Sequence, residues 1–292
     1  MEYSHLTSEQ ITQLESHGCT ASDWNTVMVT PGFNPQACRN VRFSGDVRLG
    51  SFNHTFERPG GFTVVAGISD AAIHNCTIGD DVYIHRVGNY IANYDIAEKA
   101  MIENVERIYA EGPTSFGIGT EVSVLNETGG REVPIYEFMS AQTAFLDAMY
   151  RHNPQLTDAI GRLVKKHAEE MTSTRGFIGN HAKVVNAGTV RNVHIGEYAV
   201  VEGATRLNEG FIAGSKAAPV VVGANVMADN FILASGAKVE DSVVLLNSFV
   251  GQACHLTHLF SAHDSLFFAN CVCENGEACA IFAGPYTVTM HK

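Results

Sequence analysis

A short polar segment between Asn126 and Arg131 combines residue types that bind small ligands. The adjacent glycines Gly129 and Gly130 let backbone N–H groups approach a ligand closely, and Arg131 can pair with a carboxylate or a phosphate. Glu127 can accept a proton or bind a hydroxyl group, and Asn126 adds an amide. We therefore predict a ligand-binding segment. The alternative is a turn in which Glu127 and Arg131 form an ion pair.

Thirteen histidines offer candidate general bases, because imidazole exchanges a proton near neutral pH. His85 and His263 each follow an apolar residue of a repeating pattern, so we expect both to face outward. His54 lies in a glycine-containing stretch and can point into a cleft. These three are our candidate catalytic residues. The alternative for each is a hydrated or hydrogen-bonded surface histidine.

Apolar residues recur at intervals of six along much of the chain. One run comprises Val244, Val250, Leu256, Ala262 and Phe268, and an earlier one comprises Ile78, Ile84, Tyr90, Ile96, Ile102 and Ile108. Six residues turn an α-helix by about 1.7 turns, which scatters such a stripe around the helix. A parallel β-helix uses this spacing, because each six-residue unit supplies one strand and one corner. The fold class that we predict is all-β.

This pattern resembles the hexapeptide-repeat superfamily, whose best-known members are acyltransferases. The resemblance implies a left-handed parallel β-helix in which three hexads close one coil. It also implies a histidine general base in a cleft between neighbouring subunits, and hence a homotrimer. Loops like the one at residues 214–219, which contains Lys216, help form the acyl-donor site in those enzymes. Lys216 is therefore a candidate ligand-binding residue.

We expect four regions along the chain. Residues 1–40 form a short helix, with Thr7 and Gln10 as its capping box, and a cap on the first coil. Residues 41–133 form the first coils. Residues 134–175 form an inserted α-helical hairpin, since apolar residues there recur at helical spacing and Pro154 suits a helix start. Residues 176–292 form the remaining coils.

Several segments also resemble a family of long bacterial hexapeptide-repeat proteins of unknown function. They include residues 91–96, 124–133, 264–271 and 281–289. The resemblance implies that the domain continues beyond Lys292, so we expect the chain to be part of a longer protein. Asn93, in the first segment, is a candidate ligand-binding residue. Its alternative role is a corner residue, because asparagine tolerates the left-handed backbone conformation.

Composition narrows the function classes. The formal net charge of −12 disfavours nucleic-acid binding. No apolar stretch can span a bilayer and the N-terminus lacks a signal peptide, so we expect a cytoplasmic protein without a membrane partner. The seven cysteines lack the spacing of a metal site, and we expect neither a metal nor a bound cofactor.

Two functions remain open. The first is an acyltransferase that uses acyl-CoA, or a similar thioester, as co-substrate and a sugar or sugar nucleotide as acceptor. This function rests on the superfamily resemblance. The second is a non-catalytic ligand-binding or scaffold β-helix within a longer protein.

Overall fold

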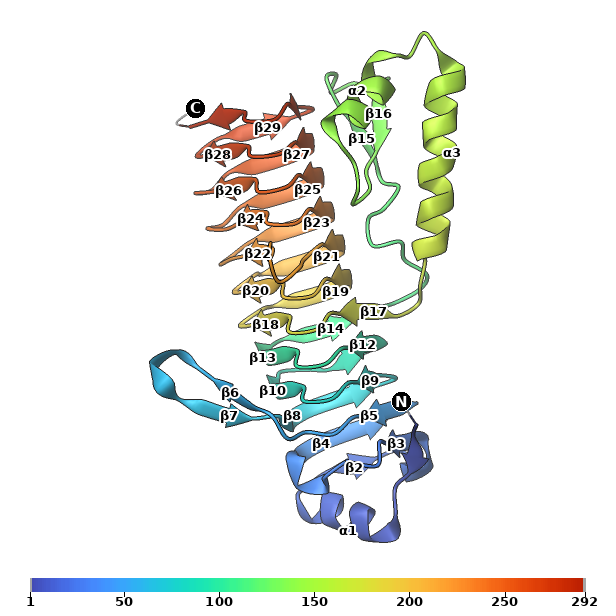
Figure 1. Ribbon diagram of the computed structural model, residues 1–292, viewed down its shortest axis with the longest axis vertical. Helices are drawn as coiled ribbons and strands as arrows, with labels where there is room; N and C mark the ends of the chain where they lie inside the picture. Colours follow the sequence, from blue (N-terminus) through green and yellow to red (C-terminus); the bar gives the residue numbers. More distant parts are fainter. Residues whose placement is uncertain (1, 291–292) are drawn as a thin grey trace.

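Twenty-seven short strands form one continuous sheet that winds into a column in the computed structural model, which describes residues 2–290 (Figure 1). Strands of this sheet pair in parallel, apart from β1 with β3. The N-terminal half of the column contains β1 (Ser4–His5), β2 (Thr20–Ala21), β3 (Val27–Val29), β4 (Cys38–Ser44), β5 (Val47–Leu49), β8 (Gly67–His74), β9 (Thr77–Ile78), β10 (Tyr83–Val87), β11 (Ile91–Ala92), β12 (Tyr94–Ile96), β13 (Met101–Val105) and β14 (Arg107–Tyr109).

The C-terminal half continues the same sheet after an insertion. Its strands are β17 (Gly176–Ile178), β18 (Lys183–Val185), β19 (Thr189–Ile195), β20 (Val200–Glu202), β21 (Arg206–Ile212), β22 (Val221–Val222), β23 (Met227–Leu233), β24 (Lys238–Val239), β25 (Val244–Val250), β26 (His255–Thr257), β27 (Ser261–Phe267), β28 (Val272–Glu274), β29 (Glu277–Cys279), β30 (Phe282–Ala283) and β31 (Val288–Thr289). The protein is therefore mostly β, as the repeat predicted.

One coil of the C-terminal half commonly takes 17 residues. Val250 pairs with Phe267 and Leu256 with Cys273, each pair being 17 residues apart. The side chains inside the column accordingly follow one another at six, six and then five residues. Strict six-residue spacing is thus interrupted once per coil. Phe268, the last member of the expected run, lies outside the column core for this reason, and Phe267 takes the inward position.

Each seven-residue strand bends at a residue with a left-handed backbone conformation, and these residues stack from one coil to the next. Asn230, Asn247 and Asp264 occupy equivalent places in successive coils and all have positive φ. Asn230 Nδ2 donates to Asn247 Oδ1 at 3.0 Å, and Asn247 Nδ2 donates to Asp264 Oδ1 at 3.1 Å. Asparagine suits this place because it tolerates positive φ and offers both a donor and an acceptor.

The insertion between β14 and β17 lies beside the C-terminal half of the column (Figure 1). It contains the antiparallel strands β15 (Glu121–Ser123) and β16 (Glu132–Pro134) and the helices α2 (Ala141–Met149) and α3 (Pro154–Met171). Its apolar side chains pack against outward-facing residues of the column and form a second core. Column residues in that core include Phe211, Ile232, Phe249 and Leu266.

Two smaller elements flank the N-terminal coils. Helix α1 (Ser8–Ser16) begins with the expected capping box, in which Thr7 and Gln10 each bond the backbone N–H of the other. Strands β6 (Thr55–Glu57) and β7 (Thr63–Val65) form a separate hairpin that projects from the column (Figure 1).

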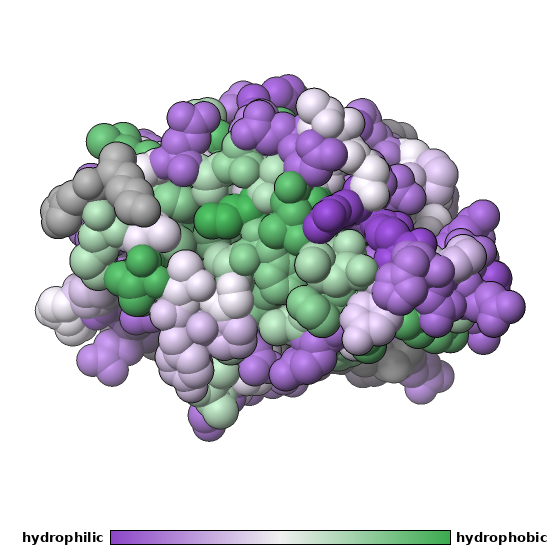
Figure 2. All heavy atoms as spheres, turned by 90° about the horizontal axis from the view of Figure 1, so that it is seen from above, coloured by the Kyte–Doolittle hydropathy of each residue, from purple (hydrophilic) through white to green (hydrophobic). Residues whose placement is uncertain are grey.

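The face at the C-terminal end of the column has apolar side chains in its middle and hydrophilic ones at its rim (Figure 2). Tyr286 and Val288 of the last coil are 75% and 59% exposed.

Candidate functional site

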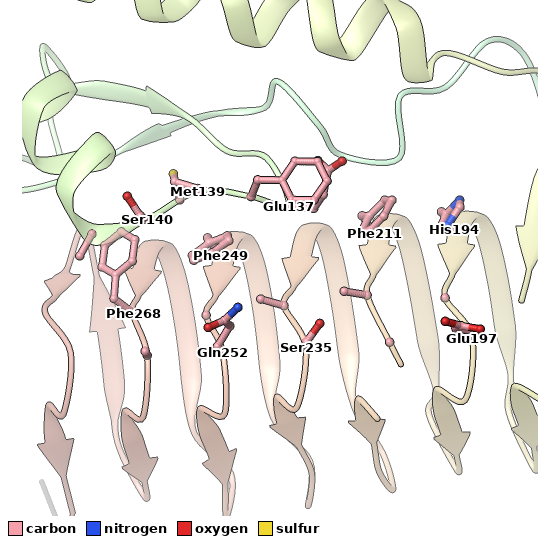
Figure 3. A pocket seen from close by; sticks show the side chains of 18 of the residues that line it. Glu137, Met139, Ser140, His194, Glu197, Phe211, Ser235, Phe249, Gln252 and Phe268 are labelled. Atoms are coloured by element: carbon pink, nitrogen blue, oxygen red, sulfur yellow. The ribbon is translucent and has the colours of Figure 1, made fainter. Parts of the chain in front are cut away.

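A cleft of about 860 Å³ lies between the insertion and the column. One wall is the segment 137–142, which leads into α2, and the opposite wall consists of side chains and corners of successive coils. In Figure 3 the segment that carries Glu137, Met139 and Ser140 lies opposite the column side chains. The volume of the cleft falls within the usual range for small-molecule sites.

A row of outward-facing apolar side chains runs along the column, and some of its members line the cleft. Parallel pairing places Phe177 beside His194 and His194 beside Phe211. The row continues through later coils with Ile232, Phe249, Leu266 and Phe282. Each member comes from a strand buried on its inner side, so the regular coil spacing fixes the row in place.

His194 is stacked within this row. Its ring lies 4.5 Å from that of Phe211, at an interplanar angle of 4°, and 4.9 Å from that of Phe177. Burial among these rings lowers the pKa of His194 to about 4, because it disfavours the charged form. At neutral pH His194 is therefore uncharged, and its ring faces are covered by Phe177 and Phe211.

A second row, of polar side chains, runs beside the first at the following corner of the coils. Asn180, Glu197, Ser235 and Gln252 each stand three residues after a member of the apolar row, and all four line the cleft. Figure 3 shows Glu197, Ser235 and Gln252 along one side of His194, Phe211 and Phe249. Among the described residues that line the cleft there is no Lys or Arg.

Glu137 brings a carboxylate to the opposite wall. Its side chain is only 6% exposed, and its Oε1 lies 2.8 Å from Nε2 of His167 on α3. Its other oxygen, Oε2, is buried and has no hydrogen-bond partner within residues 2–290. A buried carboxylate oxygen without a donor is costly, and the exposed area of this one is below 1 Å², so it does not open into the cleft.

The comparisons with known proteins place the chain in a family. The model of a domain of unknown function, DUF4954, matches residues 3–292. The chain belongs to this family. A protein of Treponema pallidum (strain Nichols), described as uncharacterized, is 26% identical to it over 245 residues. The match covers 80% of this chain and 34% of that protein, so the chain spans about a third of the length of its relative.

In this DUF4954 chain the segment from Asn126 to Arg131 is an exposed hairpin loop between β15 and β16, outside the cleft. Asn126 Nδ2 donates to Gly129 O at 2.6 Å, and Gly130 N donates to Glu132 Oε1 at 2.6 Å. Within the described residues Glu127 and Arg131 form no ion pair, and Arg131 contacts Met149 Sδ instead. The polar groups here largely satisfy one another.

The three candidate catalytic histidines lie outside the cleft. His54 is at the base of the β6–β7 hairpin, with its ring 4.7 Å from that of Phe56. His85 is on β10, where its Nδ1 lies 2.7 Å from Ser69 Oγ. His263 is exposed on β27, near the opposite end of the column from β10 (Figure 1).

The remaining two candidates also lie outside the cleft. Asn93 is at a bend, with φ of 57°, and its Nδ2 donates to Ala110 O at 2.8 Å. Lys216 is an exposed residue of the loop after β21, and Gly214 of the same loop does line the cleft.

Residues 2–290 contain neither a cluster of metal ligands nor a membrane-spanning helix. No three His, Cys, Asp or Glu side chains gather there as metal ligands. No helix in this part of the chain has the length and apolar character needed to cross a bilayer.

Sequence reasoning missed Glu137, His194, Glu197 and Phe211. For the column residues a signal exists: Phe177, His194 and Phe211 are spaced by 17 residues, which is one coil. A search for residues that recur every 17 positions, rather than every six, would have revealed the outward row. Glu137 carries no comparable signal, because its place depends on how the insertion folds back on the column.

Proposed function

We propose that this protein binds a small sugar-like ligand in the cleft between the insertion and the column. The observation that supports this proposal is the pair of parallel rows, one apolar and one polar, on a single wall. A sugar ring has one face of C–H groups and an edge of hydroxyl groups. The edges of the stacked His194 and Phe211 rings give an apolar strip for the C–H face, and Glu197, Ser235 and Gln252 suit the hydroxyl groups.

The charge of the cleft favours a sugar without a phosphate group. Glu137 and Glu197 line it, and the described lining residues include no cation that would pair with a phosphate. A nucleotide sugar or acyl-CoA therefore suits this cleft less well than a simple saccharide.

The test is a binding screen of neutral mono- and disaccharides by ligand-observed NMR and thermal shift. We expect binding by the original protein and at least tenfold weaker binding by Phe211→Ala, because that variant loses part of the apolar row that lines the cleft. Phe62→Ala is the matched control, since Phe62 is exposed on the distant hairpin. The proposal fails if no saccharide binds, or if Phe211→Ala and Phe62→Ala bind equally well.

Acyl transfer is a second candidate, which we propose for a different site. His85 Nδ1 lies 2.7 Å from Ser69 Oγ, a distance typical of a hydroxyl group and its base. In this reaction a histidine takes the proton of an acceptor hydroxyl, the oxygen attacks the thioester carbonyl, and the thiol leaves with a proton.

Thiol release from acetyl-CoA in the presence of sugar acceptors tests this second candidate. The reaction should fall at least a hundredfold in His85→Ala and stay unchanged in His263→Ala. Absence of thiol release with the original protein would argue against acyl transfer.

We also propose that the column is the left-handed β-helix of the hexapeptide-repeat superfamily. The stacked coils of 17 residues, with positive φ at regularly placed bends, support this assignment. An experimental density map would show the hand of the coil directly. A right-handed coil would contradict the assignment.

Self-association into a homotrimer and a cytoplasmic location are further proposals. Exposed apolar residues on the insertion, Phe138 at 76% and Leu163 at 69%, suit a contact with another subunit.

All seven cysteines lie in the described part of the chain and are free thiols, which is typical of a reducing compartment such as the cytoplasm. Light scattering and cell fractionation test the two proposals, and a monomer or a secreted protein would contradict them.

A further inference from the structure

The cleft is long and narrow, and it runs along the column. Seven successive coils contribute one corner residue each to its lining: Asn180, Glu197, Gly214, Ser235, Gln252, Ala269 and Pro285. Neighbouring strands of a sheet lie about 4.8 Å apart, so seven coils extend over roughly 29 Å. A volume of about 860 Å³ spread over that length leaves a small cross-section. A ligand that fills this cleft is therefore extended rather than compact.

The opposite wall runs in the same direction. Glu137, Met139 and Ser140 line the cleft from the insertion. In Figure 3 they follow one another along the apolar row, with Ser140 nearest to Phe268 and Glu137 nearer to Phe211. The insertion therefore borders the cleft along several coils and leaves its long axis parallel to the column.

The corner row offers free polar groups at four of its seven places. These are Asn180, Glu197, Ser235 and Gln252. Within residues 2–290 none of the four makes a side-chain hydrogen bond or an ion pair. The amides at the strand bends differ, because Asn230 Nδ2 donates to Asn247 Oδ1. The free groups are distributed along the cleft, so a linear ligand can meet them one after another.

We propose that the cleft binds an extended oligosaccharide with a β-1,4-linked backbone. This inference rests on the proposed sugar-binding function and adds the length and the shape of the ligand. A sugar residue in such a chain adds a length close to the distance between neighbouring strands, so the chain keeps step with the coils. Asn180 and Gln252 are separated by four coil steps, roughly 19 Å. A chain that reaches both therefore has about four residues or more.

Linkage and charge narrow the ligand further. An α-1,4-linked chain coils, and it cannot follow a straight row of corners. The described lining residues include no Lys or Arg, and both of their charged side chains, Glu137 and Glu197, are carboxylates. An anionic glycan is therefore repelled, and a neutral one fits.

Calorimetry with three series of oligosaccharides, each of two to six residues, tests the proposal. Two series are β-1,4-linked, the cello-oligosaccharides and the N-acetylated chito-oligosaccharides, and the third is the α-1,4-linked malto-oligosaccharides. We expect the affinity in at least one β-1,4-linked series to rise at least tenfold from the disaccharide to the tetrasaccharide. The malto-oligosaccharides should gain less than threefold over the same lengths.

Variants at the two ends of the polar row show whether the ligand spans it. Asn180→Ala and Gln252→Ala should each weaken tetrasaccharide binding at least threefold, and the double variant should weaken it at least tenfold. Both residues are exposed, so the substitutions leave the fold intact. Lys183→Ala is the control, because Lys183 is exposed on the same coil as Asn180 and lies outside the cleft.

The outcomes separate this inference from the function on which it rests. Disaccharides that bind as tightly as tetrasaccharides would overturn the extended ligand and leave sugar binding standing. An equal gain with length in the malto-oligosaccharides, or unchanged tetrasaccharide binding in the double variant, would also overturn it. Binding by no member of the three series, with no saccharide found in the wider screen, would overturn both.

Discussion

Tyr94 shows how one buried polar group joins the two halves of the column at the residue scale. It is fully buried, its hydroxyl donates to Val193 O at 2.9 Å, and Val193 N donates to that hydroxyl at 3.1 Å. Gly176 pairs with Tyr94 in the next coil, and a Cβ there would lie 2.1 Å from the tyrosine ring. Tyrosine and glycine therefore fit one another across the point where the insertion leaves and rejoins the column.

Tyr94→Phe should lower the free energy of unfolding by about 1–3 kcal/mol, because both backbone groups of Val193 lose their partner in the interior. Urea unfolding followed by circular dichroism measures the change. Tyr90→Phe is the control, since Tyr90 is only partly buried and should matter less. Equal effects of the two substitutions would contradict this role of the Tyr94 hydroxyl.

His194 makes stability depend on pH. Its pKa is about 4 in the folded protein and near 6.5 when unfolded, so the unfolded state binds the proton more readily. The stabilising contribution is complete above about pH 6.5 and declines as the pH falls from there towards 4. The full loss is at most about 3 kcal/mol.

The comparison of the original protein with His194→Phe tests this dependence. Phenylalanine fits the aromatic row and does not titrate in this range, so the variant should lose less stability between pH 7 and pH 4.5. Parallel loss of stability in both proteins would show that His194 is not responsible. Urea unfolding at a series of pH values supplies the measurement.

Few of the site residues were predictable one by one. The candidates in the segment from Asn126 to Arg131 were chosen for residue type, and this segment is an exposed hairpin loop outside the cleft. Residue type alone carries little information about position. His194 can be identified as a site residue only once the 17-residue coil length is known, because its place depends on stacking against Phe177 and Phe211.

At the scale of elements, the insertion is held by the outward row of the column. Phe249 is 1% exposed and belongs to the core shared by the insertion and the column. The seven-residue strand β25 presents Phe249 outward and Val250 inward, so adjacent residues serve different cores. This alternation follows from strand geometry.

Phe249→Ala should loosen the insertion and leave the N-terminal coils intact. The expected cost is about 3–5 kcal/mol, typical of a large aromatic side chain removed from a core. Hydrogen exchange should rise in α2 and in β15 and stay unchanged in β10 and β13. Leu259→Ala is the control, because Leu259 is 72% exposed. Uniformly faster exchange along the whole chain would contradict a separate core for the insertion.

The repeating strands were the most predictable elements, since many similar coils reinforce one pattern. The sequence also contains the interruption of the six-residue spacing: the run Ile178, Val184 and Val190 continues at Ile195, five residues on. Two steps of six residues and this one step of five make a coil of 17 residues. The path of the insertion was not predictable, because it depends on contacts between segments far apart in the chain.

At the scale of the whole molecule, the column supplies one wall of the cleft and the insertion supplies the opposing one. The regular coils place like residues in rows, and the insertion covers one row and leaves a cleft at its edge. The family match covers residues 3–292, so both parts belong to the same domain. A ligand held there would contact both parts at once.

The most direct test of this account is a crystal structure of the protein soaked with a neutral saccharide that binds in the screen. We predict density for the sugar in the cleft, with its ring against His194 and Phe211 and its hydroxyl groups close to Glu197, Ser235 and Gln252. Well-ordered crystals with an open, ligand-free cleft, or with the sugar bound only elsewhere, would contradict the claim that this cleft is the functional site.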